Sequence, residues 1–179
     1  MVAACEAFIE HGAGVPLDEI ARRAGIGNAT LYRHFGNRQD LIRTVTLSLL
    51  SHTANQAEAS LATEPSPFEA VRRFMHHAVN EYFGALCPML ADYSDTRDHE
   101  LYRARSRLEA LVSNLVEAAQ RSGTLRADVN ASDLTAAVAQ LARPLPGTGL
   151  ERNDHFAHRH LELLLDGLST CRPSSCPAP

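Results

Sequence analysis

A glycine-containing break between two short helical segments constrains the fold of this chain more than any other feature. The segment LDEIARRA, which begins at Leu17, places its apolar side chains at helical spacing, and so does NATLYRHF, which begins at Asn28. The residues GIG interrupt the helix between them. Two short helices joined by such a turn cross at a steep angle, so the sequence predicts a helix-turn-helix unit.

The second of these helices has the side-chain order of a helix that reads DNA. We expect an internal set of apolar residues to hold the crossing angle: Leu17, Ile20, Ala21, Ile26, Leu31, Phe35 and Leu41. The side chains left outside are Asn28, Ala29, Thr30, Tyr32, Arg33 and His34. Short hydrogen-bonding or methyl-bearing groups come first and groups able to reach a phosphate follow. A recognition helix needs this order, because its N-terminal residues meet base edges while flanking residues contact the backbone.

Charge is distributed unevenly along the chain. The net charge of -4 taken alone argues against a nucleic-acid partner. Residues 22–43, however, hold five arginines against one aspartate, whereas residues 1–21 hold four acidic residues and neither Arg nor Lys. A basic island in an acidic chain suits a confined site for a polyanion. A solvated helix face explains the charge alone about equally well.

The rest of the sequence predicts an all-α fold of about nine helices, with no sheet. Helix starts are indicated at Asn37, Ser66 and Asn130, each of which suits an N-cap. A short sixth helix is expected over residues 89–93, after Pro88. We expect three segments: a helix-turn-helix domain over residues 1–47, a ligand-binding and dimerisation domain over 48–171, and a disordered tail over 172–179.

The helix-turn-helix segment strongly resembles the TetR family of bacterial transcription regulators. The residues that carry the resemblance are Ile20-Ala21, Ala24-Gly25, Thr30-Leu31-Tyr32, His34-Phe35, Arg38 and Leu41. The similarity covers nearly all of residues 1–50, and ATLYRHF is its strongest part. It implies a homodimeric, cytoplasmic DNA-binding regulator with a C-terminal ligand-binding domain, most often a repressor that a small-molecule effector releases from double-stranded operator DNA.

The resemblance also implies roles for single residues. Tyr32 and His34 match positions that hydrogen-bond phosphates, and Arg38 matches a basic position that contacts the backbone at the start of the next helix. The positions that face bases or nearby phosphates are matched by Asn28, Ala29, Thr30 and Arg33. These implied roles agree with the polar side chains expected on the outer face of the second helix.

Three departures from the family pattern stand near the N-terminus. The family usually has a basic arm and a longer first helix before the position of Ala3, and here Met1 falls inside that helix. Gly27 stands where Ser often precedes the recognition helix, so Asn28 is expected to take over the cap. Pro16 occupies the region of a phosphate-contacting Thr or Ser. An alternative therefore stays open: a helical ligand-binding protein that has lost specific DNA binding.

Two leucine-rich segments near the C-terminus predict a dimer interface. Its candidate residues are Leu134, Val138, Leu141, Leu161, Leu164, Leu165 and Leu168. The two segments carry more apolar side chains than a pair of helices facing solvent would need. The run LELLLDGL is also similar to the last dimerisation helix of one large TetR subgroup. We expect an isologous four-helix interface that buries at least about 1,600 Å² in total.

A ligand pocket is predicted within residues 66–122. Its candidate residues are Met75, Tyr82, Cys87, Met89, Tyr93, Arg103, Leu108 and Leu111. Taken together, these deformable side chains beside a helix broken by proline suit an adaptable pocket. Any one of them taken singly is explained as an ordinary core residue. Arginines at the start of the next helix suit an anionic or carbonyl-bearing ligand.

Other classes of function find little support in the sequence. The nine histidines form no set with metal-ligand spacing, and the common catalytic and nucleotide-binding motifs are missing. We therefore expect no metal, no cofactor, no catalytic residues and no enzymatic activity, although a helical enzyme remains a rival hypothesis. No apolar run is long enough to span a membrane, so no membrane partner is expected.

Overall fold

The computed structural model describes residues 2–11, 14–80, 98–142 and 154–170, and these residues form eight α-helices. The helices are α1 (Val2–His11), α2 (Leu17–Arg23), α3 (Asn28–His34), α4 (Arg38–Thr63), α5 (Pro67–Asn80), α7 (His99–Arg121), α8 (Ala131–Leu141) and α9 (Asp154–Leu168). An isolated bridge between Leu125 and Ser169 is the sole β-pairing in the described ranges, so the all-α prediction is confirmed. The helix expected at residues 89–93 lies outside them.

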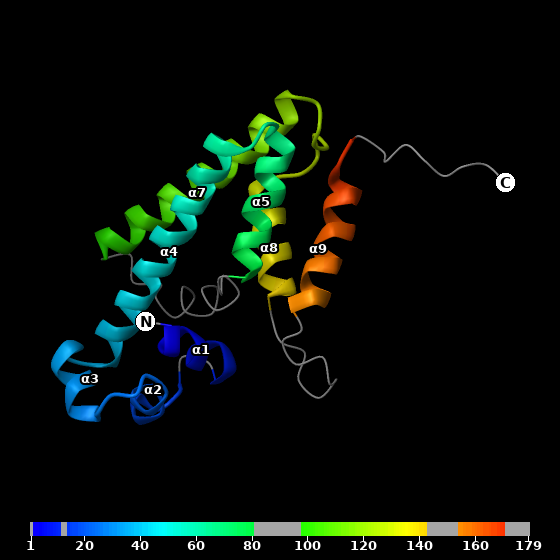
Figure 1. The fold of residues 1–179 in the computed structure, drawn as a ribbon. Helices are drawn as coiled ribbons and strands as arrows, with labels where there is room; N and C mark the ends of the chain where they lie inside the picture. The colour runs from blue at the N-terminus through cyan, green and yellow to red at the C-terminus, as the bar shows by residue number, and fades with distance from the viewer. Residues whose placement is uncertain (1, 12–13, 81–97, 143–153, 171–179) are drawn as a thin grey trace.

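The N-terminal helices surround a small core of their own, at one end of the molecule (Figure 1). Its buried members are Ala4, Cys5, Ala7, Phe8, Val15, Ile20, Leu41, Ile42 and Val45, with Leu17 and Phe35 packed against them. Burial raises the pKa of the Cys5 thiol, as expected for a cysteine that acts as a small apolar core residue.

The turn between α2 and α3 is built on Gly25, and it corrects one prediction. Gly25 has a φ of +67°, a conformation that favours glycine. Its amide bonds to the Arg22 carbonyl and the next amide bonds to the Ala21 carbonyl, which closes α2 in a Schellman motif. Ile26, expected inside, is instead 37% exposed, because this turn carries it past the end of α2.

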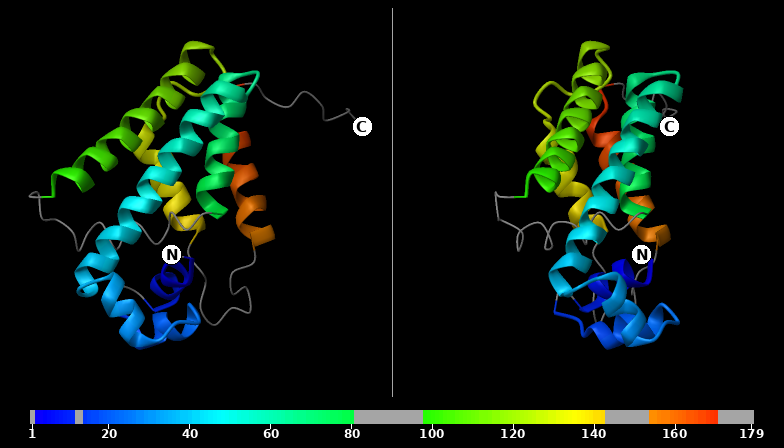
Figure 2. Two further views of the ribbon diagram at one scale, coloured as in Figure 1. Left: turned by 60° about the vertical axis from the view of Figure 1, so that its left-hand side comes forward. Right: turned by 90° about the vertical axis from the view of Figure 1, so that its left-hand side faces the viewer.

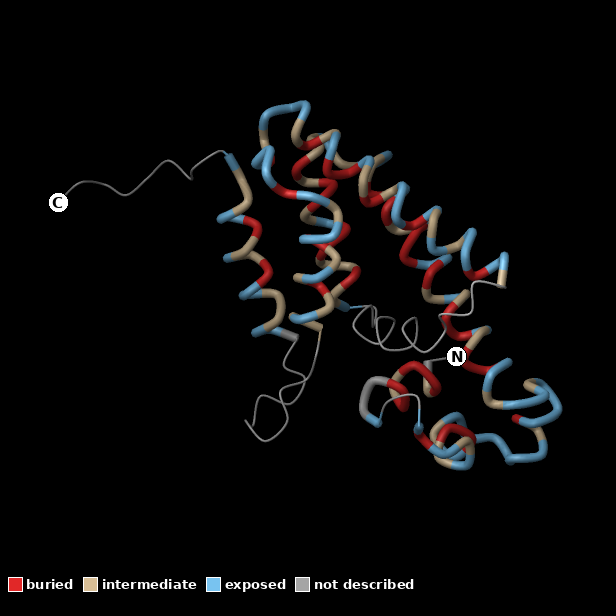
Figure 3. The backbone as a smooth tube through the Cα atoms, turned by 180° about the vertical axis from the view of Figure 1, so that it is seen from behind, coloured by how far each residue is buried: buried red, intermediate tan, exposed pale blue. Residues whose placement is uncertain are grey.

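Helix α4 contributes buried residues to both cores. Figure 3 shows buried positions recurring along it. Its first turns place Leu41 and Val45 in the N-terminal core. Further along, Leu50, Ala54 and Ala57 enter a second, larger core formed with α5, α7, α8 and α9. The second core is thus joined to the N-terminal domain by one continuous 26-residue helix.

In the C-terminal bundle, α4 packs most extensively against α7, and α5 against α4, α7, α8 and α9. Figure 2 shows α9 at an edge of the bundle, beside α5. Local signals set the helix ends. Asn37 caps α4, Asn130 and Asp133 form a capping box on α8, and Gly123 closes α7 with a φ of +69°.

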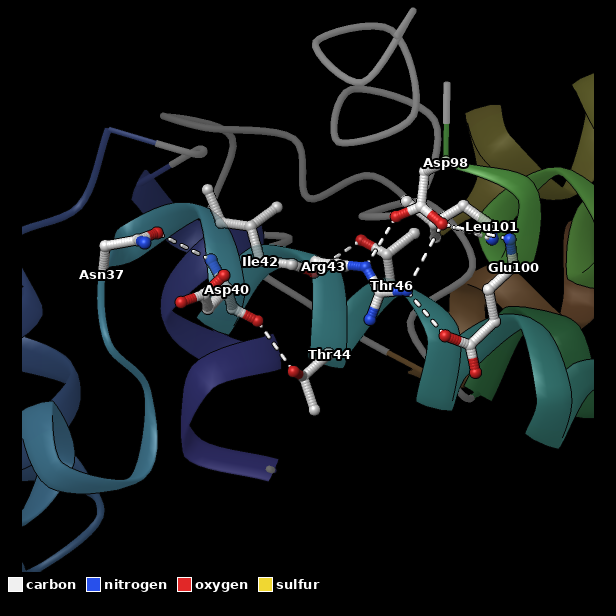
Figure 4. Close-up of polar contacts among 9 residues, drawn as sticks. All are labelled: Asn37, Asp40, Ile42, Arg43, Thr44, Thr46, Asp98, Glu100 and Leu101. Atoms are coloured by element: carbon white, nitrogen blue, oxygen red, sulfur yellow. Dashed lines mark hydrogen bonds and ion pairs between the residues drawn. The ribbon is translucent and has the colours of Figure 1, made fainter. Parts of the chain in front are cut away.

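Arg43 ties α4 to the start of α7 (Figure 4). Its Nε donates to Asp98 Oδ2 over 2.6 Å, and its Nη2 donates to Glu100 Oε2 over 2.6 Å. Asp98 is also the N-cap of α7, since its Oδ1 accepts from the backbone amides of Glu100 and Leu101. The hydrogen bond from Arg43 lowers the pKa of the Asp98 carboxyl.

We expect Asp98→Ala to lower the free energy of unfolding by about 1–2 kcal/mol near neutral pH, because it removes a helix cap together with the partner of Arg43. Since the pKa of Asp98 is lower when folded, its ionic contribution is present above the unfolded pKa and is lost as the pH falls through the folded pKa. The deficit of the variant should therefore shrink below about pH 4. Urea titrations at several pH values measure this difference in the free energy of unfolding between the wild type and the variant.

The matched control is Asp98→Asn, which keeps a good N-cap but removes the carboxylate that Arg43 contacts. This variant should retain most of the stability at neutral pH and lose the pH dependence that Asp98 contributes. Wild-type stability in Asp98→Ala at neutral pH would contradict the assignment.

Candidate nucleic-acid interface

The exposed surface of α3 carries the residues predicted to contact DNA. Leu31 is buried and fixes the inner side of the helix. Tyr32 is 50% exposed. The other predicted contacts on this helix that are exposed are Asn28, Ala29, Arg33 and His34, while Thr30 is half-buried. The structure therefore brings all six together on one short helix, in the order that the sequence indicates.

The start of α3 differs from the prediction in one detail. Gly27 occupies the N-cap and no side chain caps the helix, so Asn28 does not take over this role. Its amide Nδ2 instead donates to Asp18 Oδ1 over 2.7 Å. This contact links α3 to α2 and holds Asn28 away from its own helix end.

Most of the positive charge of the basic island is engaged within the protein. Glu19 accepts hydrogen bonds from Arg22 over 2.7 and 2.8 Å and from Arg23 over 2.7 Å, and these bonds lower the pKa of Glu19 to about 2. Arg43 is held by Asp98 as described above. Arg33, in contrast, is exposed and forms no hydrogen bond or ion pair with another described residue. The count of arginines in the sequence therefore overstates the charge that is available to a ligand.

Arg38, the first residue of α4, is half-buried, and its Nη2 donates to the backbone carbonyl of Val15. Val15 is buried immediately before α2, so this bond fixes the start of α4 against the loop that leads into α2. This positioning role could not be predicted from the sequence, because Arg38 and Val15 are 23 residues apart along the chain. A guanidinium has five N–H donors, and the bond to Val15 uses one nitrogen, Nη2.

The apolar residues predicted to form the dimer interface pack largely inside one protomer. Four of them are buried in its core: Leu134, Val138, Leu161 and Leu165. The other three, Leu141, Leu164 and Leu168, are half-buried against the same core. The outward face of α9 instead presents Phe156 and Leu163, which are 42% and 53% exposed. Their seven-residue spacing places them on one face, and that spacing was the signal available in the sequence.

The residues predicted to line a ligand pocket are described only in part. Met75 of α5 and Leu108 of α7 are buried in one apolar cluster, and Leu111 packs against it. Arg103 is exposed, whereas Arg107 pairs with Glu58 of α4 over 2.8 Å. The remaining four candidates lie outside the described residues: Tyr82, Cys87, Met89 and Tyr93.

A polar cluster joins α5 to α9 beside the core. His76 Nδ1 and His158 Nδ1 are 2.6 Å apart, His158 Nε2 lies 2.6 Å from Asn80 Oδ1, and His76 also contacts Glu162. Within the described ranges, no group of three or more His, Cys, Asp or Glu side chains could hold a metal ion. These histidines thus link two helices.

The fold and the exposed face of α3 define a class: helix-turn-helix proteins with an all-helical C-terminal domain. Residues 1–45 match the family model for bacterial regulatory proteins of the tetR family, and residues 66–170 match the C-terminal domain of SbtR-like transcriptional regulators. The chain therefore belongs to the TetR family and is a DNA-binding transcription regulator. None of the helices that the structure describes is long and apolar enough to cross a membrane.

Solved structures agree with this assignment along nearly the whole chain. The TetR regulator SCO0520 of Streptomyces coelicolor is 30% identical, with a TM-score of 0.65 and coverage of 95% of this chain and 97% of its own. A TetR regulatory protein of Mycobacterium vanbaalenii is 32% identical, with a TM-score of 0.62 and coverage of 94% and 92%. KstR2 of Mycobacterium tuberculosis shares the fold at 16% identity, with a TM-score of 0.70 and coverage of 95% and 93%. No curated protein sequence matches this chain.

Proposed function

We propose that this regulator is a homodimeric, non-enzymatic repressor that leaves its operator when a small molecule binds the C-terminal domain. The observation that carries the proposal is the exposed α3 face, where Arg33 lies beside Tyr32 and His34 and forms no hydrogen bond or ion pair with another described residue. These groups suit a major groove and its flanking phosphates.

The dimer places two copies of α3 on the same side of the DNA. We assign the contact between protomers to the outward faces of α8 and α9, centred on Phe156 and Leu163. In an isologous interface each of these side chains meets the partner's copy of the same surface. Half-sites one helical turn apart require the two recognition helices to lie about 34–36 Å apart.

Release of DNA follows from the position of α4. The effector site is assigned to the C-terminal bundle between α5 and α7, beside Met75 and Leu108. Because α4 contributes to both cores, an effector that repacks the second core also shifts the N-terminal domain and changes the spacing of the two α3 helices. A ligand that favours the released spacing by about 5.5 kcal/mol shifts the population almost completely.

A reporter gene placed behind the DNA upstream of this gene tests the proposal. Expression of the protein should lower reporter output, and a screen of small metabolites should find one that restores it. The matched control is a protein carrying Arg33→Ala, which should leave the reporter unrepressed. An increase in reporter output with the wild-type protein would contradict the repressor role.

A separate prediction concerns Arg38. If its remaining donors contact a phosphate, Arg38→Ala should lower the slope of log K against log salt by about one. Arg105→Ala is the control, because Arg105 lies on α7 and pairs with Glu109, and it should leave the slope unchanged. An unchanged slope for Arg38→Ala would assign Arg38 to positioning alone.

A further inference from the structure

We propose that Arg33 reads a guanine in each operator half-site, with Ala29 against the methyl group of a neighbouring thymine. This inference rests on the proposed operator binding and names the bases that the α3 surface recognises. It is carried by the position of the two residues on α3 and by the absence of competing partners for Arg33 among the described residues.

The position of each side chain around α3 follows from the buried residue Leu31. An α-helix turns through about 100° per residue, so residues two before and two after a given position lie about 160° from it on either side. Ala29 and Arg33 are those residues, and both are exposed. They form the outermost line of α3, on the side away from the core.

Two further side chains of α3 lie on the flanks of this line. Thr30 and Tyr32 are about 100° to either side of Leu31. Thr30 is half-buried while Tyr32 is half-exposed, which agrees with positions at the edges of the exposed face. A helix in a groove turns its outermost line to the base edges and its flanks to the backbone, so Arg33 and Ala29 face bases while Tyr32 faces a phosphate.

The functional groups of Arg33 and Ala29 determine which bases they can recognise. The planar guanidinium of Arg33 matches the two major-groove acceptors of guanine, O6 and N7, through two parallel hydrogen bonds. Arg22, Arg23 and Arg43 cannot take this role without breaking contacts to carboxylates. Ala29 lies one turn from Arg33, about 6 Å along the helix axis or less than two base-pair steps. Its methyl suits the thymine methyl, which is the apolar group of the major groove.

Selection of binding sites from random duplexes by the full chain tests the proposal. The enriched half-site should contain a guanine, and replacing it with adenine or 7-deazaguanine should weaken wild-type binding by roughly 5- to 150-fold. Arg33→Ala should bind the guanine site and its substituted forms with equal affinity. Ala29→Gly should reduce only the preference for thymine over uracil within two steps of that guanine. Circular dichroism confirms that each variant is folded.

The outcomes separate this inference from the proposed function. If Arg33→Ala weakens binding to all sequences equally, lowers the salt slope by about one and keeps the preference for guanine, Arg33 contacts a phosphate and the inference is wrong. Enrichment of half-sites without a guanine also overturns it. If the wild-type protein enriches no site, the proposed operator binding itself fails.

Discussion

A Leu163→Glu variant should be monomeric at micromolar concentration and should bind operator DNA at least about 100-fold more weakly than the wild type. Leu163 is 53% exposed on α9, so the substitution leaves the protomer core intact. In a two-fold interface the change places two carboxylates in the apolar contact, and burying unpaired charge there opposes association. Loss of the dimer removes the second half-site contact. Sedimentation and fluorescence anisotropy measure the two effects.

Tyr102→Glu provides the matched control for this prediction. Tyr102 is 65% exposed, but it lies on α7 and outside the proposed contact. Its variant should remain dimeric and bind operator normally. A dimeric Leu163→Glu protein would show that the protomers meet through another surface.

Leu165→Ala should have the largest effect on stability, a loss of about 3 kcal/mol in the free energy of unfolding. Leu165 is fully buried where α9 packs into the C-terminal core, so truncation leaves a cavity among its neighbours. Tyr102→Ala, on the exposed side of α7, should change stability by less than about 0.5 kcal/mol. Urea unfolding followed by circular dichroism measures both variants.

The Leu165 result distinguishes two positions for this side chain. A folded monomer with wild-type protomer stability would place Leu165 in the dimer contact, as the sequence predicts, instead of in the core. A destabilised protein that still dimerises would support the burial seen in the structure.

Much of the fold could be predicted from the sequence, because helix ends depend on local chemistry. Asn37 and Asn130 cap α4 and α8 as expected, and α5 begins directly after Ser66, since a cap needs only the amides that follow it. The exposed set on α3 could also be predicted except for Thr30, which is half-buried, because one buried residue in a short helix determines the outer face.

Contacts between distant helices could not be predicted in this way. The sequence shows that α9 is rich in leucine, but the helix it packs against decides that Leu161 points inward and Leu163 outward. Likewise, the charge of Arg43 looks available until α7 brings Asp98 beside it. Local pattern identifies an amphipathic helix, whereas the tertiary partner determines which polar groups remain free for a ligand.

The most direct test of the account is an affinity comparison at physiological salt between the DNA upstream of this gene and a scrambled duplex of the same length and composition. A sequence-specific regulator should bind the upstream DNA at least about 1,000-fold more tightly, with two protomers on each site. Equal affinity for the two duplexes would contradict the account and favour a helical ligand-binding protein that has lost specific DNA recognition.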